Sequence, residues 1–143
     1  MAIQRVATAA ELARCLALRE RVFVDEQHVP RELELDDKDD QCTHFLATEG
    51  DVDTGTARLL KLDQGQAKAQ RVAVDRRYRK SGVGRALMSA LEDEAKAQAC
   101  VVVVLSSQVS AIRFYERLGY QSTGPVYDDA GIPHRDMRKA LVL

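Results

Sequence analysis

The segment "QRVAVDRRYRKSGVGRAL", residues 70–87, joins a short apolar strand pattern to a basic turn that contains two glycines. Val72 and Val74 alternate with other residue types, which predicts a β-strand that ends near residue 75. From residue 81 to residue 99, apolar side chains recur every fourth position, which predicts an amphipathic helix. Gly82 and Gly84 therefore fall where this helix is expected to begin.

The glycine turn has the chemistry of an anion-binding site. The first N–H groups of a helix have no intrahelical partner, and the helix dipole adds partial positive charge there. Glycine lets a phosphate approach the backbone closely, and Arg79, Lys80 and Arg85 add formal charge. The segment is neither a P-loop nor a dinucleotide-binding turn, because it lacks GxxxxGK and carries Leu87 where the latter needs Gly or Ala. The alternative is a helix start with glycines and surface arginines.

Composition limits the classes of function. A chain of 143 residues suits one domain, residues 1–143, with one core. A net charge of −1 gives no field that favours nucleic acid or an anionic membrane. No apolar run approaches the roughly 20 residues of a membrane span, and no signal peptide is evident. Three scattered cysteines without CxxC argue against a disulfide framework or a metal site. We therefore expect a cytoplasmic protein without bound metal.

Charge is uneven along the chain. Eight acids and two bases lie in residues 25–40, whereas six bases and one acid lie in residues 71–85. This pattern predicts one region suited to a cation and another suited to an anion. The alternative is that both are solvated loops.

The rest of the chain divides into short elements with turn residues between them. A helix is expected over residues 8–26, with Thr8 as its N-cap and Glu11 completing a capping box. The β-branched run "VVVVL", residues 101–105, is typical of a strand covered on both faces. The other expected elements are strands at 2–7, 42–50, 54–63, 66–75, 119–124 and 134–143, a helix at 109–118, and an irregular segment at 28–41. This order predicts an α/β (α+β) protein with one mixed sheet and helices on its faces.

The strand, the turn "RKSGVG", the helix, the strand "VVVVL" and the helix "SAIRFYERLGY" together resemble the GNAT N-acetyltransferase superfamily. Arg79, Gly82 and Gly84 match its motif Gln/Arg-x-x-Gly-x-Gly/Ala. The segments "RERVFVDEQHVPRELELDD", "SSQVSAIRFYERLGY" and "VYDDAGIPHRDM" are similar to the ElaA-type branch of small, single-domain acetyltransferases. The resemblance implies a GNAT fold: a central sheet of about six to seven strands, helices on both faces, and a splayed parallel pair in the middle.

The resemblance also implies acetyl-CoA as cosubstrate, lying between the strand that contains residues 72–74 and the strand at 101–106. An open strand edge at Val72 and Val74 would pair with the pantetheine arm, and N–H groups of residues 79–85 would hold the pyrophosphate. Arg113 and Arg117 would lie near the ribose phosphate or simply on the surface. The residues that the resemblance assigns to the cosubstrate are Val72, Ala73, Val74, Arg79, Lys80, Gly82, Val83, Gly84, Arg85, Ala111 and Tyr115.

Tyr115 matches the position of the proton donor to the departing CoA thiolate. A phenol with a pKa near 10 can donate a proton without ionising at rest. The alternative is a core aromatic side chain, because Phe114 and Tyr115 cannot both face inward on one helix. The resemblance implies transfer of acetyl to an amine by direct attack in a ternary complex.

The base that deprotonates the amine is less defined. The segment "AKAQRVAV", residues 67–74, has no carboxylate where some family members carry a glutamate. Glu26 and His134 are predicted as catalytic residues, His28 and His44 are further candidates, and a mechanism without a dedicated base is the alternative. The acids in residues 25–40 would attract a small, cationic amine.

Two other functions are alternatives to acetyl transfer. A non-catalytic CoA-binding or regulatory module would keep the cradle and lack turnover. A nucleic-acid binder is disfavoured, because the chain lacks a basic pI and aromatic residues interleaved with its bases. Pairing of two copies through the C-terminal strands is a further expectation from the resemblance.

Overall fold

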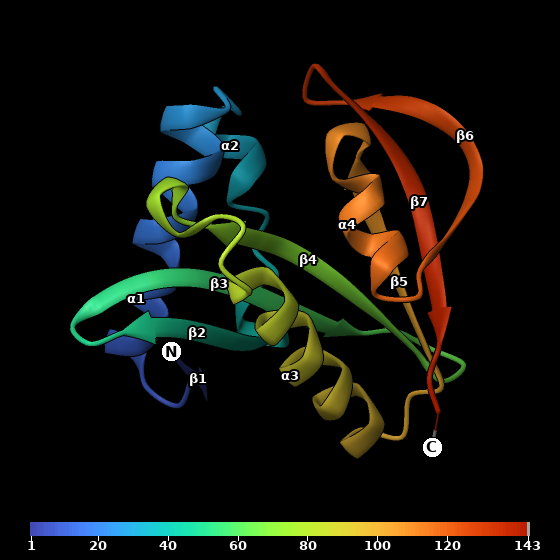
Figure 1. Ribbon diagram of the computed structural model, residues 1–143, viewed down its shortest axis with the longest axis horizontal. Helices are drawn as coiled ribbons and strands as arrows, with labels where there is room; N and C mark the ends of the chain where they lie inside the picture. Colours follow the sequence, from blue (N-terminus) through green and yellow to red (C-terminus); the bar gives the residue numbers. More distant parts are fainter. Residues whose placement is uncertain (143) are drawn as a thin grey trace.

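A seven-stranded mixed sheet forms the centre of the computed structural model, which describes residues 1–142 (Figure 1). Its strands, in spatial order, are β1 (Ala2–Arg5), β2 (Thr43–Glu49), β3 (Val52–Lys61), β4 (Gln66–Val74), β5 (Val102–Gln108), β7 (Ile132–Ala140) and β6 (Gln121–Asp129). Among the strands of the described residues, only β4 and β5 run parallel, and the other neighbouring pairs are antiparallel. The predicted mixed sheet with a central parallel pair is therefore confirmed. Leu143, the last residue of the predicted closing strand, lies outside the described residues.

Helices cover both faces of the sheet, as predicted (Figure 1). Helix α1 (Ala9–Arg19) and the single turn α2 (Arg31–Glu34) lie on one face, and α3 (Val83–Ala97) and α4 (Ile112–Arg117) lie on the other. The predicted capping box is present, because the Glu11 N–H donates to the Thr8 hydroxyl and the Glu11 carboxylate accepts from the Thr8 N–H. Short 3₁₀ turns are η2 (Asp39–Gln41), η3 (Arg76–Tyr78) and η4 (Val109–Ala111).

The first helix differs from its prediction. It was expected to run to residue 26, but α1 ends at Arg19 and the chain continues as a π-helix, η1 (Glu20–Glu26). The Gln27 N–H donates to the Val22 carbonyl at 3.1 Å, five residues back along the chain. Apolar periodicity does not distinguish this wider winding from an α-helix. Single π turns occur often at functional sites, and this one ends beside the centre of the sheet.

Helix α3 is fixed to the sheet by its predicted apolar face, which buries Val83, Leu87, Met88, Leu91 and Ala95. Gly55 on β3 permits this close packing. A Cβ at Gly55 would lie 2.7 Å from Val83 Cγ1 and 2.8 Å from Leu87 Cδ1. The start of α3 is thereby held against the middle of the sheet. Within residues 1–142, no helix has the length and apolar character needed to cross a membrane.

Strands β4 and β5 separate halfway along their length (Figure 1). Their parallel pairing runs from Gln66 and Val102 to Ala69 and Leu105, and then stops. Arg71 has a φ of 54°, and the register of β4 against β3 shifts there, which is the signature of a β-bulge. The bulge bends β4 away from β5, so the edge of β4 at residues 72–74 has no strand partner on that side. The predicted splayed pair is confirmed.

Candidate active site

The loop after β4 leads into an uncapped helix start. Gly82 is the N-cap of α3 and has a φ of 91°, a conformation that glycine adopts without a steric cost. The Ser81 hydroxyl donates back to the Tyr78 carbonyl and does not cap the helix. The first helical hydrogen bond is from the Ala86 N–H to the Gly82 carbonyl at 3.0 Å. The N–H groups of residues 83–85 thus find no acceptor within the described chain and are free to bind an anion.

Gly84 has a second role that the sequence did not reveal. A Cβ at this position would lie 3.0 Å from Cζ of Phe114 and 3.3 Å from Cε1 of the same ring. The missing side chain therefore lets α4 approach the first turn of α3. Because Tyr115 follows Phe114 on α4, this contact also sets the position of Tyr115.

Tyr115 is buried, with 8% of its surface exposed, and its ring makes an edge contact with Phe114 at 4.9 Å between centroids. Phe114 is half-buried and lies against the start of α3, whereas Tyr115 points into the core. The two neighbouring rings therefore do not both face inward, as expected. Burial raises the pKa of the Tyr115 hydroxyl above its ordinary value. The phenol therefore stays protonated at neutral pH and makes no hydrogen bond to another described residue.

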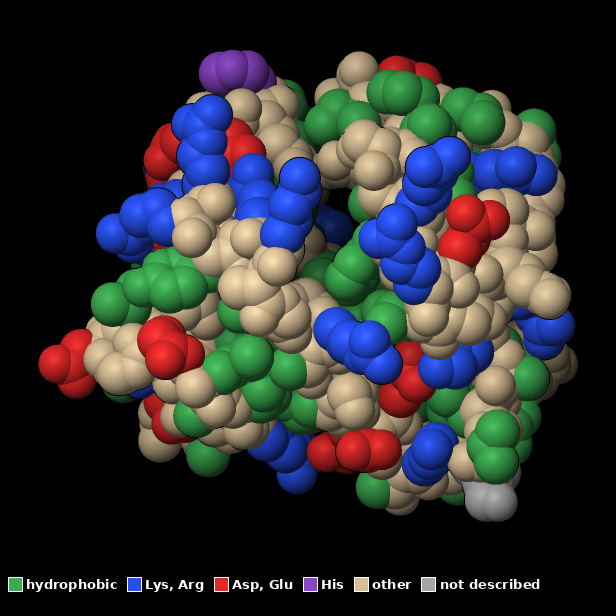
Figure 2. Space-filling model, in the orientation of Figure 1, with side chains coloured by type: hydrophobic (Ala, Val, Ile, Leu, Met, Phe, Trp, Pro, Cys, Tyr) green, Lys and Arg blue, Asp and Glu red, His purple; other side chains and the backbone are tan. Residues whose placement is uncertain are grey.

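Arg79 occupies the open edge of β4. Its Nε donates to the Val74 carbonyl at 3.1 Å, and its two terminal nitrogens bind both Glu26 oxygens at 2.6 and 2.8 Å. The hydrogen bond from Arg79 lowers the pKa of the Glu26 carboxyl, although partial burial opposes this. Glu26 is therefore a weak base in this arrangement. Figure 2 shows a hollow in this face of the molecule, with Lys and Arg side chains on both sides of it.

The histidine candidates lie in different places. His28 is exposed, and His44 is buried in β2 with Nε2 2.7 Å from the Asp39 carbonyl. His134 lies on β7 with Nδ1 2.7 Å from the Ile132 carbonyl. A carbonyl only accepts, so Nδ1 carries a proton and donates it to this hydrogen bond. Glu26 and His134 are not brought into contact.

A hydrogen bond closes one end of the splay. Gln108 Nε2, at the end of β5, donates to Gln27 Oε1, just after η1, at 2.8 Å. Glu26 and Gln27 are adjacent, so the end of the π-helix contacts both the Arg79 loop and β5.

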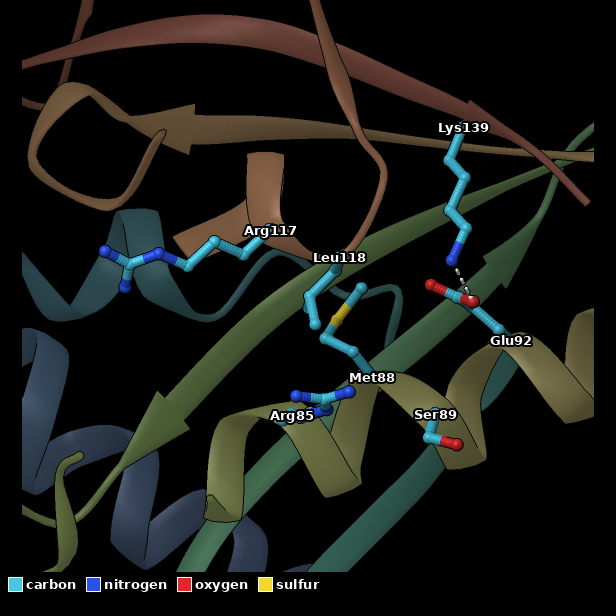
Figure 3. Close-up of a pocket in the computed structure, with 7 residues that line it drawn as sticks. All are labelled: Arg85, Met88, Ser89, Glu92, Arg117, Leu118 and Lys139. Atoms are coloured by element: carbon cyan, nitrogen blue, oxygen red, sulfur yellow. Dashed lines mark hydrogen bonds and ion pairs between the residues drawn. The ribbon is translucent and has the colours of Figure 1, made fainter. Parts of the chain in front are cut away.

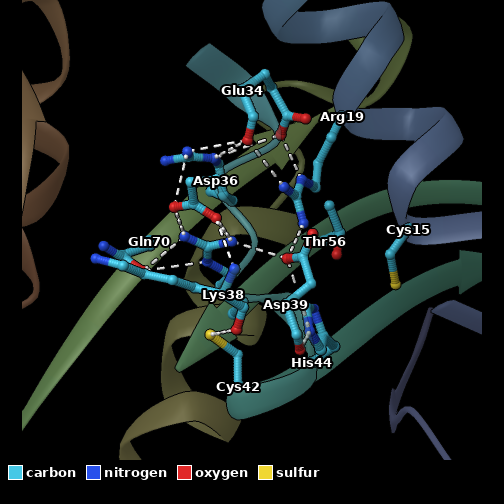
Figure 4. A network of polar contacts seen from close by, with 12 residues as sticks. Cys15, Arg19, Glu34, Asp36, Lys38, Asp39, Cys42, His44, Thr56 and Gln70 are labelled. Atoms are coloured by element: carbon cyan, nitrogen blue, oxygen red, sulfur yellow. Dashed lines mark hydrogen bonds and ion pairs between the residues drawn. The ribbon is translucent and has the colours of Figure 1, made fainter. Parts of the chain in front are cut away.

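The acidic stretch does not form a free negative surface. Its acids Glu34, Asp36 and Asp39 are paired with three arginines from α1, β3 and β4: Arg19, Arg58 and Arg71 (Figure 4). Arg19 and Arg58 are 1% and 0% exposed. Four of the eight acids, Glu26 included, are thus neutralised within the protein, which weakens the predicted attraction of a cationic amine. The sequence alone does not predict these ion pairs, because the two partners of each pair lie on different elements.

A pocket of about 220 Å³ lies between α3 and the end of α4 (Figure 3). It is lined by Arg85, Met88, Ser89, Glu92, Arg117, Leu118 and Lys139. Lys139 Nζ binds Glu92 at 2.8 Å, so Arg85 and Arg117 supply the unpaired charge of the described lining. Arg85 lies in the first turn of α3, next to its uncapped start. Of the lining residues, Arg85 was predicted to bind the cosubstrate, and Arg117 was predicted to lie either near the ribose phosphate or on the surface.

The comparisons with known proteins agree with this geometry. Residues 6–141 match the family model described as "Acetyltransferase (GNAT) domain". The chain belongs to the GNAT acetyltransferase family. Acetyl-CoA is accordingly its cosubstrate.

Relatives extend over nearly the whole chain. The Bacillus subtilis protein YyaT is 35% identical over 144 residues, which cover 99% of this chain and 97% of YyaT. The crystal structure of an acyl-CoA N-acyltransferase from Pseudomonas aeruginosa is 31% identical, with a TM-score of 0.83, and covers 97% of this chain and 100% of that one. The crystal structure of Escherichia coli ElaA is 29% identical, with a TM-score of 0.83, over 96% of this chain and 98% of ElaA. The predicted ElaA-type GNAT membership is confirmed.

Proposed function

We propose that residues 1–143 act as one acetyltransferase domain that transfers the acetyl group of acetyl-CoA to an amine by direct attack in a ternary complex. The observation that carries this proposal is the end of β4–β5 pairing at Ala69 and Leu105. Beyond that point, the open edge at Val72 and Val74 leads to the uncapped start of α3. A thioester tail in the splay and a diphosphate on the helix amides would both be bound by backbone groups.

Tyr115 supplies the proton or hydrogen bond that the leaving thiolate needs. The phenol is buried and uncharged, and it is free of partners among the described residues. A raised pKa makes it chiefly a hydrogen-bond donor to the developing negative charge on sulfur. Ala111, in η4 just before α4, lies where the tail would pass Tyr115.

The direct test is release of CoASH from acetyl-CoA in the presence of amines. The panel contains spermidine, lysine, kanamycin and a peptide with a free amino terminus, and mass spectrometry identifies the acetylated product. Acetylation of one of these amines is expected. Tight binding of acetyl-CoA without CoASH release on any amine would favour the non-catalytic module instead.

Glu26 acts on the cosubstrate through Arg79 and is not the base. Because the pyrophosphate and Glu26 compete for Arg79, Glu26→Gln is expected to leave kcat unchanged and to tighten acetyl-CoA binding by about two- to fivefold, the effect of one exposed ion pair. Calorimetry measures the Kd, and CoASH release measures kcat. A fall in kcat of about 100-fold with unchanged binding would assign the base to Glu26 after all.

Arg85 and Arg117 bind the phosphorylated ribose of the cosubstrate. Arg117→Ala is expected to raise the KM for acetyl-CoA by about three- to tenfold, the loss of one charge-assisted contact. The KM for the 3′-dephospho analogue should change by less than about twofold. Arg113→Ala, on the same helix but outside the pocket lining, is the control. Equal effects of Arg117→Ala on both cosubstrates would place the 3′-phosphate elsewhere.

A further inference from the structure

Ser106 is the first residue of β5 beyond its last pairing with β4. Leu105 is 3% exposed and packs under α3 and α4 in the main core. Because side chains alternate along a strand, Ser106 points to the opposite face. Gln70 of β4 points to that face as well, where it accepts from Arg58. The gap between the separating strands β4 and β5 is therefore flanked by Tyr115 on the sheet face that α3 and α4 cover, and by Ser106 on the opposite face.

Ser106 begins a chain of hydroxyl groups that ends at a carboxylate. Its hydroxyl contacts the Tyr127 hydroxyl, which lies 2.6 Å from Asp136 Oδ1. A carboxylate only accepts, so Tyr127 donates its single hydrogen to Asp136. Tyr127 must then accept from Ser106. The Ser106 oxygen keeps a lone pair that can accept a further hydrogen bond.

The β6–β7 hairpin positions this series of hydrogen-bonded side chains. Asp136 is the register partner of Ser106 on the neighbouring strand. The register of β6 shifts between Thr123 and Tyr127, and Arg135 Nε supports the irregular turn by donating to the Gly124 carbonyl at 2.9 Å. The His134 ring stacks on Tyr127 with 6.2 Å between centroids. Tyr127 is 37% exposed and Asp136 is exposed, so the Asp136 end of this hydrogen-bonded series reaches solvent.

We propose that Ser106, Tyr127 and Asp136 form a proton relay that takes the proton from the acceptor amine during acetyl transfer. The relay rests on the proposed function and supplies the base that residues 67–74 lack. An N–H bond of the ammonium form breaks first, and its electron pair stays on nitrogen and then forms the C–N bond. Ser106 gains that proton and passes its own to Tyr127, and Tyr127 passes its own to Asp136, which releases it to water. The C–S bond then breaks, the thiolate takes a proton from Tyr115, and the second proton lost by the nitrogen restores Tyr115.

Charged groups of both signs surround the relay. Arg138 lies two residues beyond Asp136 on the same face of β7, without an ion pair to Asp136 in the described chain, and Lys68 lies on the facing edge of β4. Asp128 and Asp129 lie on β6, and His134 lies on β7. Burial and then the hydrogen bond to Asp136 raise the pKa of Tyr127. Tyr127 therefore stays neutral and passes a proton on without holding a charge.

Tyr127→Phe tests the relay, because it keeps the ring and its stacking on His134 but removes the central hydroxyl. The assay uses acetyl-CoA and the panel amine with the highest turnover, from pH 6 to pH 10. We expect kcat at pH 7 to fall about 100-fold, with the KM for acetyl-CoA unchanged. The deficit should shrink toward pH 10, where more of the amine is already neutral. Ser106→Ala should give the same profile, and Asp129→Asn, which removes a nearby acid outside the relay, should give the wild-type profile.

An unchanged pH profile of kcat in Tyr127→Phe would overturn the relay, as would a profile altered only by His134→Gln. A wild-type protein that releases no CoASH with any amine overturns the proposed function first, and the relay with it.

Discussion

Tyr115→Phe is expected to lower kcat for acetyl transfer by about 100-fold, the lower range for loss of one acid–base group, while the Kd for acetyl-CoA stays unchanged. The substitution removes only the hydroxyl and preserves the ring contacts with Phe114 and Tyr120. Burial raises the pKa of Tyr115, so no loss of activity from its ionisation should occur up to pH 10. The pH dependence of kcat, followed by CoASH release, checks both statements.

Tyr120→Phe is the matched control. Tyr120 is also a buried tyrosine in the main core, but its hydroxyl donates to Glu92 at 2.8 Å and not toward the splay. This variant should lose stability and keep its kcat. Equal losses of kcat in both variants would show that Tyr115 acts through core packing and would refute its role as donor.

Arg58→Ala is expected to lower the free energy of unfolding by about 3–5 kcal/mol, because it removes a fully buried guanidinium from its ion pairs with Asp36 and Asp39. Arg58 is 0% exposed and binds Asp36 at 2.5 Å, Asp39 at 2.8 Å and Gln70 at 2.9 Å. Urea unfolding measures the change. Arg14→Ala, which breaks the exposed pair with Asp53, should cost less than about 1 kcal/mol. Similar small costs in both variants would contradict a stabilising role for the buried network.

The same network predicts an acid-sensitive stability. The hydrogen bond from Arg58 lowers the pKa of Asp36, and the bonds from Arg19 and Arg58 outweigh burial to lower that of Asp39. A carboxyl with a lowered pKa in the folded state stabilises the fold above its unfolded pKa, about 4. This stabilisation is lost as the pH falls below that value. The difference between wild type and Arg58→Ala should therefore shrink below about pH 4.

Much of the fold followed from local patterns. The sequence predicted the apolar face of α3, the capping box at Thr8, and the strands with their order along the chain. Each of these features depends on residues that are close in sequence. Gly82 was also readable as the start of a helix, because a positive φ and an open N-terminus are properties of a few neighbouring residues. The segment that names the family, Arg79 to Gly84, is equally local.

Contacts between distant residues could not be read in this way. The bulge at Arg71, the pairing of Glu26 with Arg79, the approach of Phe114 to Gly84 and the register that places Tyr127 beside Asp136 all depend on how separate elements pack. The acidic stretch shows the difference most clearly. Its charges are evident in the sequence, but only the packing of α1, β3 and β4 decides that arginines neutralise them, because an ion pair requires two side chains within a few ångströms whatever their separation along the chain.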